Sequence, residues 1–285
     1  MPDADPIHME QDTKTLGFVD ADGTNRQEYT FILAGGSGRQ SGILSHDLMS
    51  QYASCPRWSL LGDELVFSIR DTVPNMRLID ASGKMHGQTC VDVVGAGKLT
   101  FNLQGNVFNE ITKHAQVYKD YKEIADAALI VRYDLKSCQI VSVFSVPVPF
   151  GYLMGEIQES ENGLLVAAFY DLETQIDAIL LYDQTTGESQ TLPGFHPSLT
   201  EDGALLAYYN MEGTLVIRDM ETGVEKELIS VIPSSWGYHS YMSMPGWSPD
   251  HQWLVYNTAE GHIFKINIET REHVYLTYGW APDWR

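Results

Sequence analysis

Residues 216–223 read VIRDMETG, an apolar strand that ends in an aspartate and runs into a glycine turn. Such an aspartate can accept hydrogen bonds from backbone amides two or three residues later, and the glycine supplies the positive φ that a bulged hairpin needs. The pattern occurs six times in the chain, with the strands ending at Asp20, Asp80, Asp134, Asp183, Asp219 and Asn267. In two of these copies Cys138 and Arg271 stand in place of the glycine.

A second element precedes most copies of this pattern. It has a strand that opens after a proline, a polar turn, and a second strand of β-branched and aromatic residues. The clearest examples are CPRWSLLGDELVFS (55–68), FHPSLTEDGALLAYYN (195–210) and MPGWSPDHQWLVYN (244–257), and a degenerate version is GEIQESENGLLVAAFY (155–170). Because the two elements alternate, the repeating unit has four short strands, and the sequence predicts an all-β fold.

The spacing of the copies predicts a ring of sheets. Successive copies lie 36 to 60 residues apart, which leaves no room for another domain. The chain stops at APDWR (281–285), the beginning of another second element, whose continuation can only be the N-terminal strands around Phe18 and residues 26–32. A radial array avoids unpaired edges when both chain ends share one sheet. We therefore expect a single closed six-bladed β-propeller over residues 1–285, with blades at about 1–32 plus 278–285, 54–95, 96–145, 150–192, 195–230 and 244–277.

These repeats resemble the TolB-like β-propeller family, in which a blade begins PxWSPDG and later carries an apolar strand, an aspartate and a glycine turn. Residues 248–251, SPDH, are close to that motif, whereas SLLGD (59–63) and SLTEDG (198–203) depart from it. No tryptophan is followed by aspartate, so the WD-repeat dipeptide is absent. The resemblance implies a six-bladed propeller but no activity, because this fold carries unrelated functions.

Charge and composition limit the classes of partner that the protein can bind. The 285 residues hold 18 Lys and Arg against 38 Asp and Glu, a net charge of −20 that repels phosphate backbones and anionic lipids. We expect no nucleic-acid or membrane partner. No stretch of 18 apolar residues and no apolar leader occurs, so we expect a soluble, cytoplasmic protein. We also expect a monomer. The cysteines are Cys55, Cys90 and Cys138, which predict neither a disulfide framework nor a cysteine zinc site.

Catalytic and cofactor motifs are missing from the sequence. GGSGR (35–39) fails the nucleophile pattern GxSxG, and GAGK (95–98) lacks the first glycine and the final Ser or Thr of a phosphate loop. None of the nine histidines has the spacing of a metal-ligand pair, although a site across blades from His46, His196 and His239 stays geometrically open. We therefore predict no catalytic residue, no metal and no cofactor.

Long loops predict which face of the ring is used. In four-stranded blades the first and third turns lie at one end, and the second turn and the connections between blades lie at the other. The long segments at about 33–54, 103–126, 146–154 and 231–244 fall at this second end, where binding residues usually reside. Residues 108–125 also carry a helical apolar stripe, so we expect a short helix there. The predicted binding residues are the loop aromatics and their neighbours, Trp236, Tyr238, His239, Tyr241, Met242, Phe150, Tyr152, His46 and Arg39.

The leading functional hypothesis is a non-catalytic recognition scaffold that binds a protein or peptide at the long-loop face and channel mouth. Its basis is the missing chemistry together with the unequal loop lengths. The alternative is a propeller-type enzyme, a lyase or hydrolase acting on a saccharide or peptide at the channel mouth. A third hypothesis is a binder of small molecules or sugars.

Overall fold

The computed structural model describes strands along the whole chain and most of the residues after 140. Strands alone make up its regular secondary structure within the described ranges. The residues described are 13–18, 21–24, 27–32, 57–58, 64–70, 74–80, 85–89, 100–101, 107–113, 127–134, 140–147, 151–171, 173–174, 176–231, 243–258, 260–279 and 282–284.

The described strands form one hairpin and five four-stranded antiparallel sheets. The hairpin pairs β1 (Thr13–Phe18) with β2 (Gln27–Ile32). In every four-stranded sheet the strands neighbour one another in chain order, so each sheet is a meander. The first two of these sheets contain β3 (Arg57–Trp58), β4 (Glu64–Arg70), β5 (Pro74–Asp80) and β6 (Met85–Thr89), then β7 (Thr100–Phe101), β8 (Val107–Lys113), β9 (Ala127–Asp134) and β10 (Ile140–Pro147).

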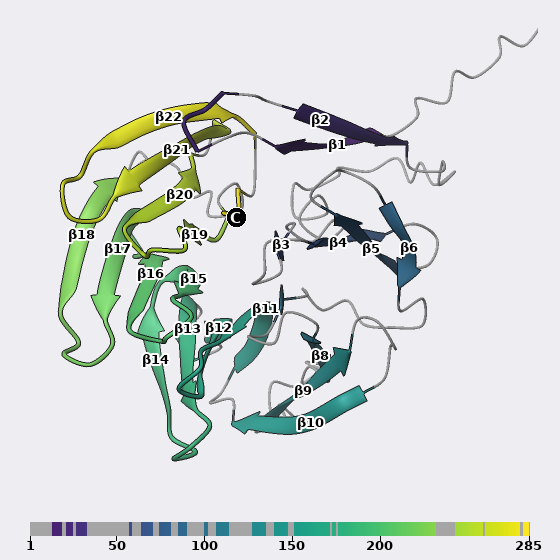
Figure 1. Ribbon diagram of the computed structural model, residues 1–285. Helices are drawn as coiled ribbons and strands as arrows, with labels where there is room; N and C mark the ends of the chain where they lie inside the picture. The colour runs from purple at the N-terminus through teal and green to yellow at the C-terminus, as the bar shows by residue number, and fades with distance from the viewer. Residues whose placement is uncertain are drawn as a thin grey trace, which may run out of the picture.

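The last three sheets are described in most detail. The sheets follow one another around a common centre, each with its first strand innermost and its fourth outermost, as in a β-propeller (Figure 1). Their strands are β11 (Gly151–Glu159), β12 (Leu164–Asp171), β13 (Ile176–Asp183), β14 (Ser189–Pro193), β15 (Phe195–Leu199), β16 (Leu205–Tyr209), β17 (Thr214–Asp219), β18 (Glu225–Ser230), β19 (Gly246–Trp247), β20 (Trp253–Asn257), β21 (His262–Asn267) and β22 (His273–Tyr278).

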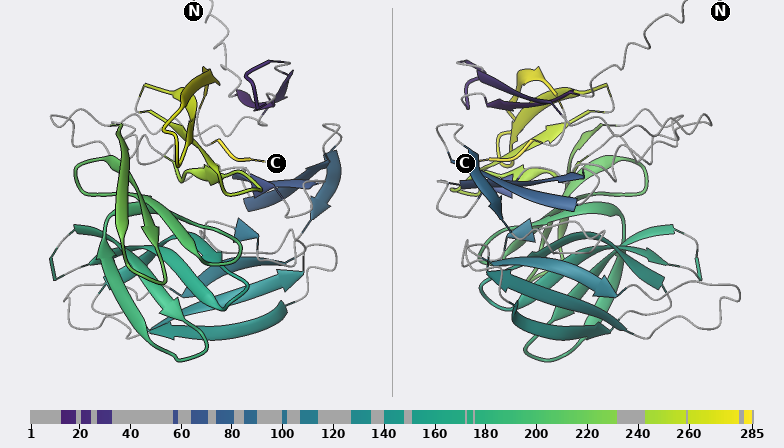
Figure 2. Two further views of the ribbon diagram at one scale, coloured as in Figure 1. Left: turned by 60° about the vertical axis from the view of Figure 1, so that its left-hand side comes forward. Right: turned by 90° about the vertical axis from the view of Figure 1, so that its right-hand side faces the viewer.

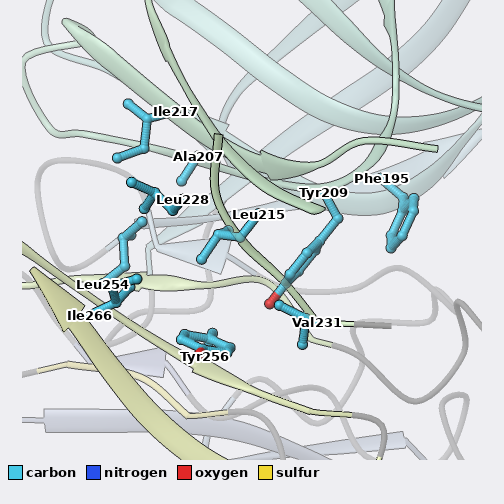
Figure 3. Close-up of a cluster of buried hydrophobic side chains, with 10 residues drawn as sticks. All are labelled: Phe195, Ala207, Tyr209, Leu215, Ile217, Leu228, Val231, Leu254, Tyr256 and Ile266. Carbon is cyan, nitrogen blue, oxygen red and sulfur yellow. The ribbon is translucent and has the colours of Figure 1, made fainter. Parts of the chain in front are cut away.

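The middle strands of the β15–β18 sheet are apolar on both sides because another sheet packs against each face. In β16, for example, the last four residues are all buried. Tyr209 packs with Leu215, Leu254 and Tyr256, so one core cluster joins β15–β18 to β19–β22 (Figure 3). Residues on the other face of β16, such as Leu206, pack with Ile179 of the β11–β14 sheet. Burial on both faces explains the uninterrupted apolar runs that the sequence shows in these strands.

The predicted turns are present where the structure describes them. Strands β13, β17 and β21 end at Asp183, Asp219 and Asn267, and each of these side chains accepts backbone hydrogen bonds from residues two or three positions later. The glycine position that follows has φ of 75° at Gly187 and 71° at Gly223. Arg271 adopts 60° at the same position, so this turn forms without glycine.

The first and third turns of a sheet lie at one end, which we call the turn end. Backbone hydrogen bonds join the two turns in all three sheets, for example from Met220 N to the Ala204 oxygen at 2.9 Å. At the opposite end, which we call the loop end, the second turn is bonded to the exit of the fourth strand. The amide of Gly279 donates to the Gly261 oxygen there at 2.7 Å, and that of Val231 to the Gly213 oxygen at 3.0 Å.

Carboxylates at the turn end are held as hydrogen-bond acceptors. The Thr200 hydroxyl donates to Asp202 at 2.7 Å and the Ser248 hydroxyl to Asp250 at 2.6 Å, and these bonds lower the pKa of both aspartates. The backbone amide of Thr222 likewise lowers the pKa of Asp219. These hydrogen bonds favour the charged form of each aspartate, because the ionised carboxylate is the form that accepts them.

Side chains of one sheet reach the backbone of the next. The indole of Trp247 donates to the Ser198 oxygen at 3.0 Å. On the outer strands, Lys226 Nζ donates to the Ile268 oxygen at 2.7 Å, and the Arg271 guanidinium donates to the Glu227 oxygen at 3.0 Å. These bonds connect β15–β18 to β19–β22 along both their inner and outer parts.

Described residues near both chain ends contact the β19–β22 sheet. A Cβ added at Gly23, in the turn between β1 and β2, would lie 3.1 Å from the Leu276 oxygen. Trp284 packs with Val255 and Leu276. In both views of Figure 2 the β1–β2 hairpin lies beside β21 and β22. It remains a separate two-stranded sheet among the described strands.

The helix expected over 108–125 is wrong for its first part. Residues 107–113 form β8, in which Ile111 pairs with Ile130 and Phe108 with Tyr133 of β9. Ile111, the one residue of the predicted helical stripe that is described, is thus part of a strand paired with β9. Residues 114–126 lie outside the described ranges.

Candidate binding surface

Most of the residues predicted from the sequence to form the binding site lie outside the described residues. Tyr152 alone falls in a described strand, at the start of β11, where it pairs with Tyr170 at the loop end. The surface they were expected to form stays a prediction. The residues outside the described ranges are Arg39, His46, Phe150, Trp236, Tyr238, His239, Tyr241 and Met242.

Another aromatic surface lies within the described residues, on β21 and β22. We call it the aromatic ledge and define it as His262, Phe264, His273, Tyr275 and Tyr278. The register places Phe264 opposite Tyr275 and His262 opposite Tyr278. A bulge between Ile263 and Phe264 keeps both pairs on one side of the sheet, since it adds a residue to β22 between Tyr275 and Tyr278.

The rings of the ledge contact one another. Phe264 and His273 stack with their centroids 4.5 Å apart, and Phe264 meets Tyr275 edge to face at 5.5 Å. His262 lies 6.0 Å from both Tyr275 and Tyr278, again edge to face. Such pairs fix ring orientation and contribute about 0.5–1.5 kcal/mol each beyond the area they bury. The ledge is therefore an ordered surface on a sheet.

Exposure distinguishes the ledge from the core. Tyr275 is 52% exposed and Tyr278 is 53% exposed, and His262 and His273 are exposed too, whereas Phe264 is half-buried and packs against the core. The ledge runs along β22, which is the outermost strand of its sheet. Its His262 and Tyr278 lie toward the loop end, next to the bond between Gly279 and Gly261.

The equivalent strands of the two preceding sheets are polar. Strands β18 and β22 have the same alternation of exposed and buried residues, with Leu228 and Leu276 at the buried position. The strand register equates His273 and Tyr275 of β22 with Glu225 and Glu227 of β18 and with Ser189 and Thr191 of β14. Aromatic side chains at these exposed positions are thus peculiar to β22 among the three outer strands.

The ledge continues inward to the core. Tyr256 of β20 stacks on His273 at 5.9 Å, and its hydroxyl is hydrogen-bonded to His273 Nε2 at 2.5 Å. The His273 side chain is exposed at its edge, yet its ring is partly desolvated where it stacks on Phe264 and Tyr256, and this desolvation lowers its pKa. Burial raises the pKa of Tyr256, so both groups are held neutral near pH 7. The next ring inward is Tyr209, which packs in the same core cluster as Tyr256.

Tyr209 is the one described side chain with a buried and unpaired polar atom. Its ring is fully buried, and its hydroxyl oxygen has no hydrogen-bond partner among the described residues. In Figure 3 the hydroxyl points toward Val231, the last described residue before 232–242. Burial raises the pKa of this phenol well above 10, so it stays protonated and is a hydrogen-bond donor.

Strand β15, nearer the centre, begins with a strained segment. His196 has φ of 54° although it carries a side chain and precedes Pro197. Its ring meets Phe195 at 5.4 Å and Tyr209 at 6.4 Å, both edge to face. His196 thus stands at the loop end, where the sequence placed it in an open cross-blade metal site. His46 and His239 of that site are not described.

The side chains of the ledge are suited to binding by contact. Within the described residues, no group of three or more His, Cys, Asp or Glu side chains could hold a metal ion. The ledge offers flat rings, two imidazoles and phenol hydroxyls. In the same part of the chain, no helix is long and apolar enough to cross a membrane.

Comparison with known proteins supplies similarity in structure alone. No protein-family model matches the sequence, and no curated protein matches it. Among solved structures, the β-propeller domain of Cps50 (Swd1) from Myceliophteria thermophila is 14% identical, with a TM-score of 0.46 over 78% of this chain and 67% of that one. A chain of the Mitotic Checkpoint Complex is 16% identical, with a TM-score of 0.49 over 96% of this chain and 71% of that one. At these values the similarities give no information about function.

Proposed function

We propose that the protein is a non-catalytic recognition scaffold that binds a protein or peptide, with the aromatic ledge as one contact surface. The observation that supports this most directly is the exposure of Tyr275 and Tyr278, each more than half accessible within an ordered set of rings. Tyrosine gives a large contact area at a small cost in side-chain entropy, and for this reason it is enriched at the centres of protein interfaces.

The position of the ledge supports the same proposal. Its rings are carried by a four-stranded sheet whose other face packs through Val255, Ile263 and Leu276. A partner would therefore meet a surface that is already ordered and would lose little free energy in fixing it. The ledge also extends toward the loop end, where the long segments with Trp236 and Tyr241 were expected to bind.

The finer architecture is part of the proposal. We propose that the five four-stranded sheets and the β1–β2 hairpin make a closed six-bladed ring of the TolB-like kind. Support comes from the contacts of Gly23 and of Trp284 with the same β19–β22 sheet. The net charge of −20 argues against nucleic-acid and anionic membrane partners. A monomeric state and a cytoplasmic location stay predictions from the sequence.

The test is selection of random displayed peptides on the immobilised protein, followed by affinity measurements on the selected peptides. The double variant Tyr275→Thr with Tyr278→Ser introduces residues that β14 and β18 carry at or next to the equivalent positions. We expect it to weaken binding of the selected peptides at least about tenfold, because two aromatic contacts are lost. The matched control is Glu227→Thr on β18, which should leave the affinity unchanged.

Circular dichroism and the denaturation midpoint of the double variant establish that it folds. Equal affinity of the folded double variant and the wild type would exclude the ledge as the contact surface. Failure to select any peptide that binds the wild type would count against the recognition function itself.

A further inference from the structure

The chemistry around the ledge indicates the kind of segment that it binds, and this inference rests on the proposed function. Two carboxylates flank the ledge in sequence. Glu260 lies two residues before His262, and Glu272 directly precedes His273; both are exposed. The whole chain carries an excess of 20 negative charges, so the field around the ledge attracts cations.

Three described cations on or beside the sheet that carries the ledge are engaged elsewhere. The Arg271 guanidinium donates to the Glu227 oxygen at 3.0 Å, across the junction of two sheets. Lys226 Nζ donates to the Ile268 oxygen at 2.7 Å and lies 3.5 Å from the Glu269 carboxylate. Both therefore serve the contact between β18 and the β21–β22 turn. Lys265 lies over the Trp253 ring at 4.7 Å, on the opposite face of the sheet from Phe264.

Exposed tyrosine faces attract cations directly. The ring quadrupole of tyrosine binds an arginine or lysine side chain placed over its face, and a nearby carboxylate strengthens that preference. Tyr275 and Tyr278 offer half-exposed rings. Glu272 directly precedes β22, and Glu260 adjoins Gly261, whose oxygen accepts the hydrogen bond from Gly279 just beyond the other end of that strand. The combination of rings and acids matches a cationic side chain better than a neutral or acidic one.

The shape of the ledge matches an extended segment. Strand β22 has six residues, which span about 17 Å, and a segment in extended conformation presents alternate side chains to one side over the same length. A second copy of this chain would carry the same net charge of −20 and would be repelled. Nucleic acid is disfavoured for the same reason.

We infer that the aromatic ledge binds a basic, extended segment of a partner protein, with arginine or lysine side chains over Tyr275 and Tyr278 and attracted by the carboxylates beyond the two ends of β22, Glu260 and Glu272. The partner is defined by this chemistry: alternating cationic residues in an unfolded stretch of chain.

The test uses a fluorescein-labelled peptide of alternating arginine and serine, with two companions in which citrulline or glutamate replaces arginine. Fluorescence anisotropy measures binding to the full chain. We expect the arginine peptide to bind at least about tenfold more tightly than the citrulline peptide, and the glutamate peptide not to bind. Added salt should weaken the arginine complex, because the carboxylates contribute through charge.

Variants locate the site and separate the contribution of the tyrosine rings from that of the carboxylate charges. Tyr275→Phe with Tyr278→Phe keeps the rings and should retain binding, whereas Tyr275→Leu with Tyr278→Leu keeps apolar area and should lose about tenfold. Glu260→Gln with Glu272→Gln should reduce both the affinity and its dependence on salt. The double variant Glu225→Gln with Glu227→Gln on β18 is the matched control and should change neither by as much.

The outcomes distinguish this inference from the proposed function. Equal binding of the arginine and citrulline peptides, or a preference for arginine that the leucine substitutions leave unchanged, would overturn the basic-segment inference. Neutral peptides that bind through Tyr275 and Tyr278 would overturn the inference too, yet they would leave the recognition function standing.

Discussion

Strands β18 and β22 occupy equivalent places in neighbouring sheets and share one pattern of burial, but they expose different chemistry. Both bury a leucine, Leu228 in β18 and Leu276 in β22. At the exposed positions β18 presents Glu225, Glu227 and Ser230, whereas β22 presents His273, Tyr275 and Tyr278. The comparison separates what the fold requires from what it leaves open. The scaffold fixes the buried leucine, and the exposed residues are available for a function.

The largest expected effect concerns the buried leucine that β18 and β22 have in common. Leu228→Ala and Leu276→Ala each remove a mostly buried side chain from a packed cluster, so we expect each to lower the free energy of unfolding by about 2–4 kcal/mol. Urea denaturation measures both, with Thr191→Ala on the exposed side of β14 as the control. If Leu276→Ala alone left the free energy of unfolding almost unchanged, β22 would not be packed against its core cluster as β18 is.

A smaller effect is expected at the first turns of the same two sheets. Gly203 has φ of 74°, and a Cβ there would lie 2.7 Å from the side chains of Asn162 and Ser160. We expect Gly203→Ala to lower the free energy of unfolding by about 1–3 kcal/mol, through the clash and the left-handed backbone.

The matched change in the next sheet should have the opposite sign. His251 occupies the equivalent turn position with φ of 55°, so His251→Gly removes a backbone cost. Part of that gain is offset by loss of its contact with Trp247, whose ring lies 6.3 Å away. We expect a net stabilisation of about 0.5 kcal/mol, measured by the same denaturation experiment. Destabilisation as large as that of Gly203→Ala would contradict this account of the turns.

The smallest effect concerns pH and the imidazole that β18 lacks. Burial holds the pKa of His273 below its usual value of 6.5, so the unfolded chain binds this proton more readily than the folded chain. The resulting contribution to stability is fully present above pH 6.5 and is lost as the pH falls below that value. Denaturation between pH 7.5 and 5.5 should therefore show a steeper loss for the wild type than for His273→Phe, which keeps an aromatic ring. Parallel pH profiles for the two proteins would contradict this assignment.

Local chemistry made the turns and the strands predictable. The aspartate at position 219 and the asparagine at 267 meet backbone amides within the next three residues, so a short stretch of sequence contains the whole interaction. The all-β class and the antiparallel four-stranded sheets follow from repetition of such stretches, and the structure confirms both. Even Arg271 fits, because the hydrogen bonds of its turn compensate for the missing glycine.

Interactions between distant residues explain what the sequence did not predict. The stripe in residues 108–125 resembles a helix until Ile111 is placed against Ile130 of β9, a pairing that no local pattern reveals. The ledge was missed because the exposure of Tyr275 depends on how far the outer edges of neighbouring sheets stand apart. One signal was available in the sequence: aligning ELIS (227–230) with YLTY (275–278) on their common leucine shows aromatic residues at exposed positions. The sequence-predicted contacts around Trp236 stay predictions.

The bonds between sheets explain how β22 could acquire these residues. Trp247, Lys226 and Arg271 all donate to main-chain oxygens of the adjoining sheet, and every residue type provides such an oxygen. A duplicated repeat can therefore diverge in its side chains without losing the attachment to its neighbour. The exposed aromatic residues of β22 and the exposed carboxylates of β18 are thus compatible with one mode of attachment between sheets.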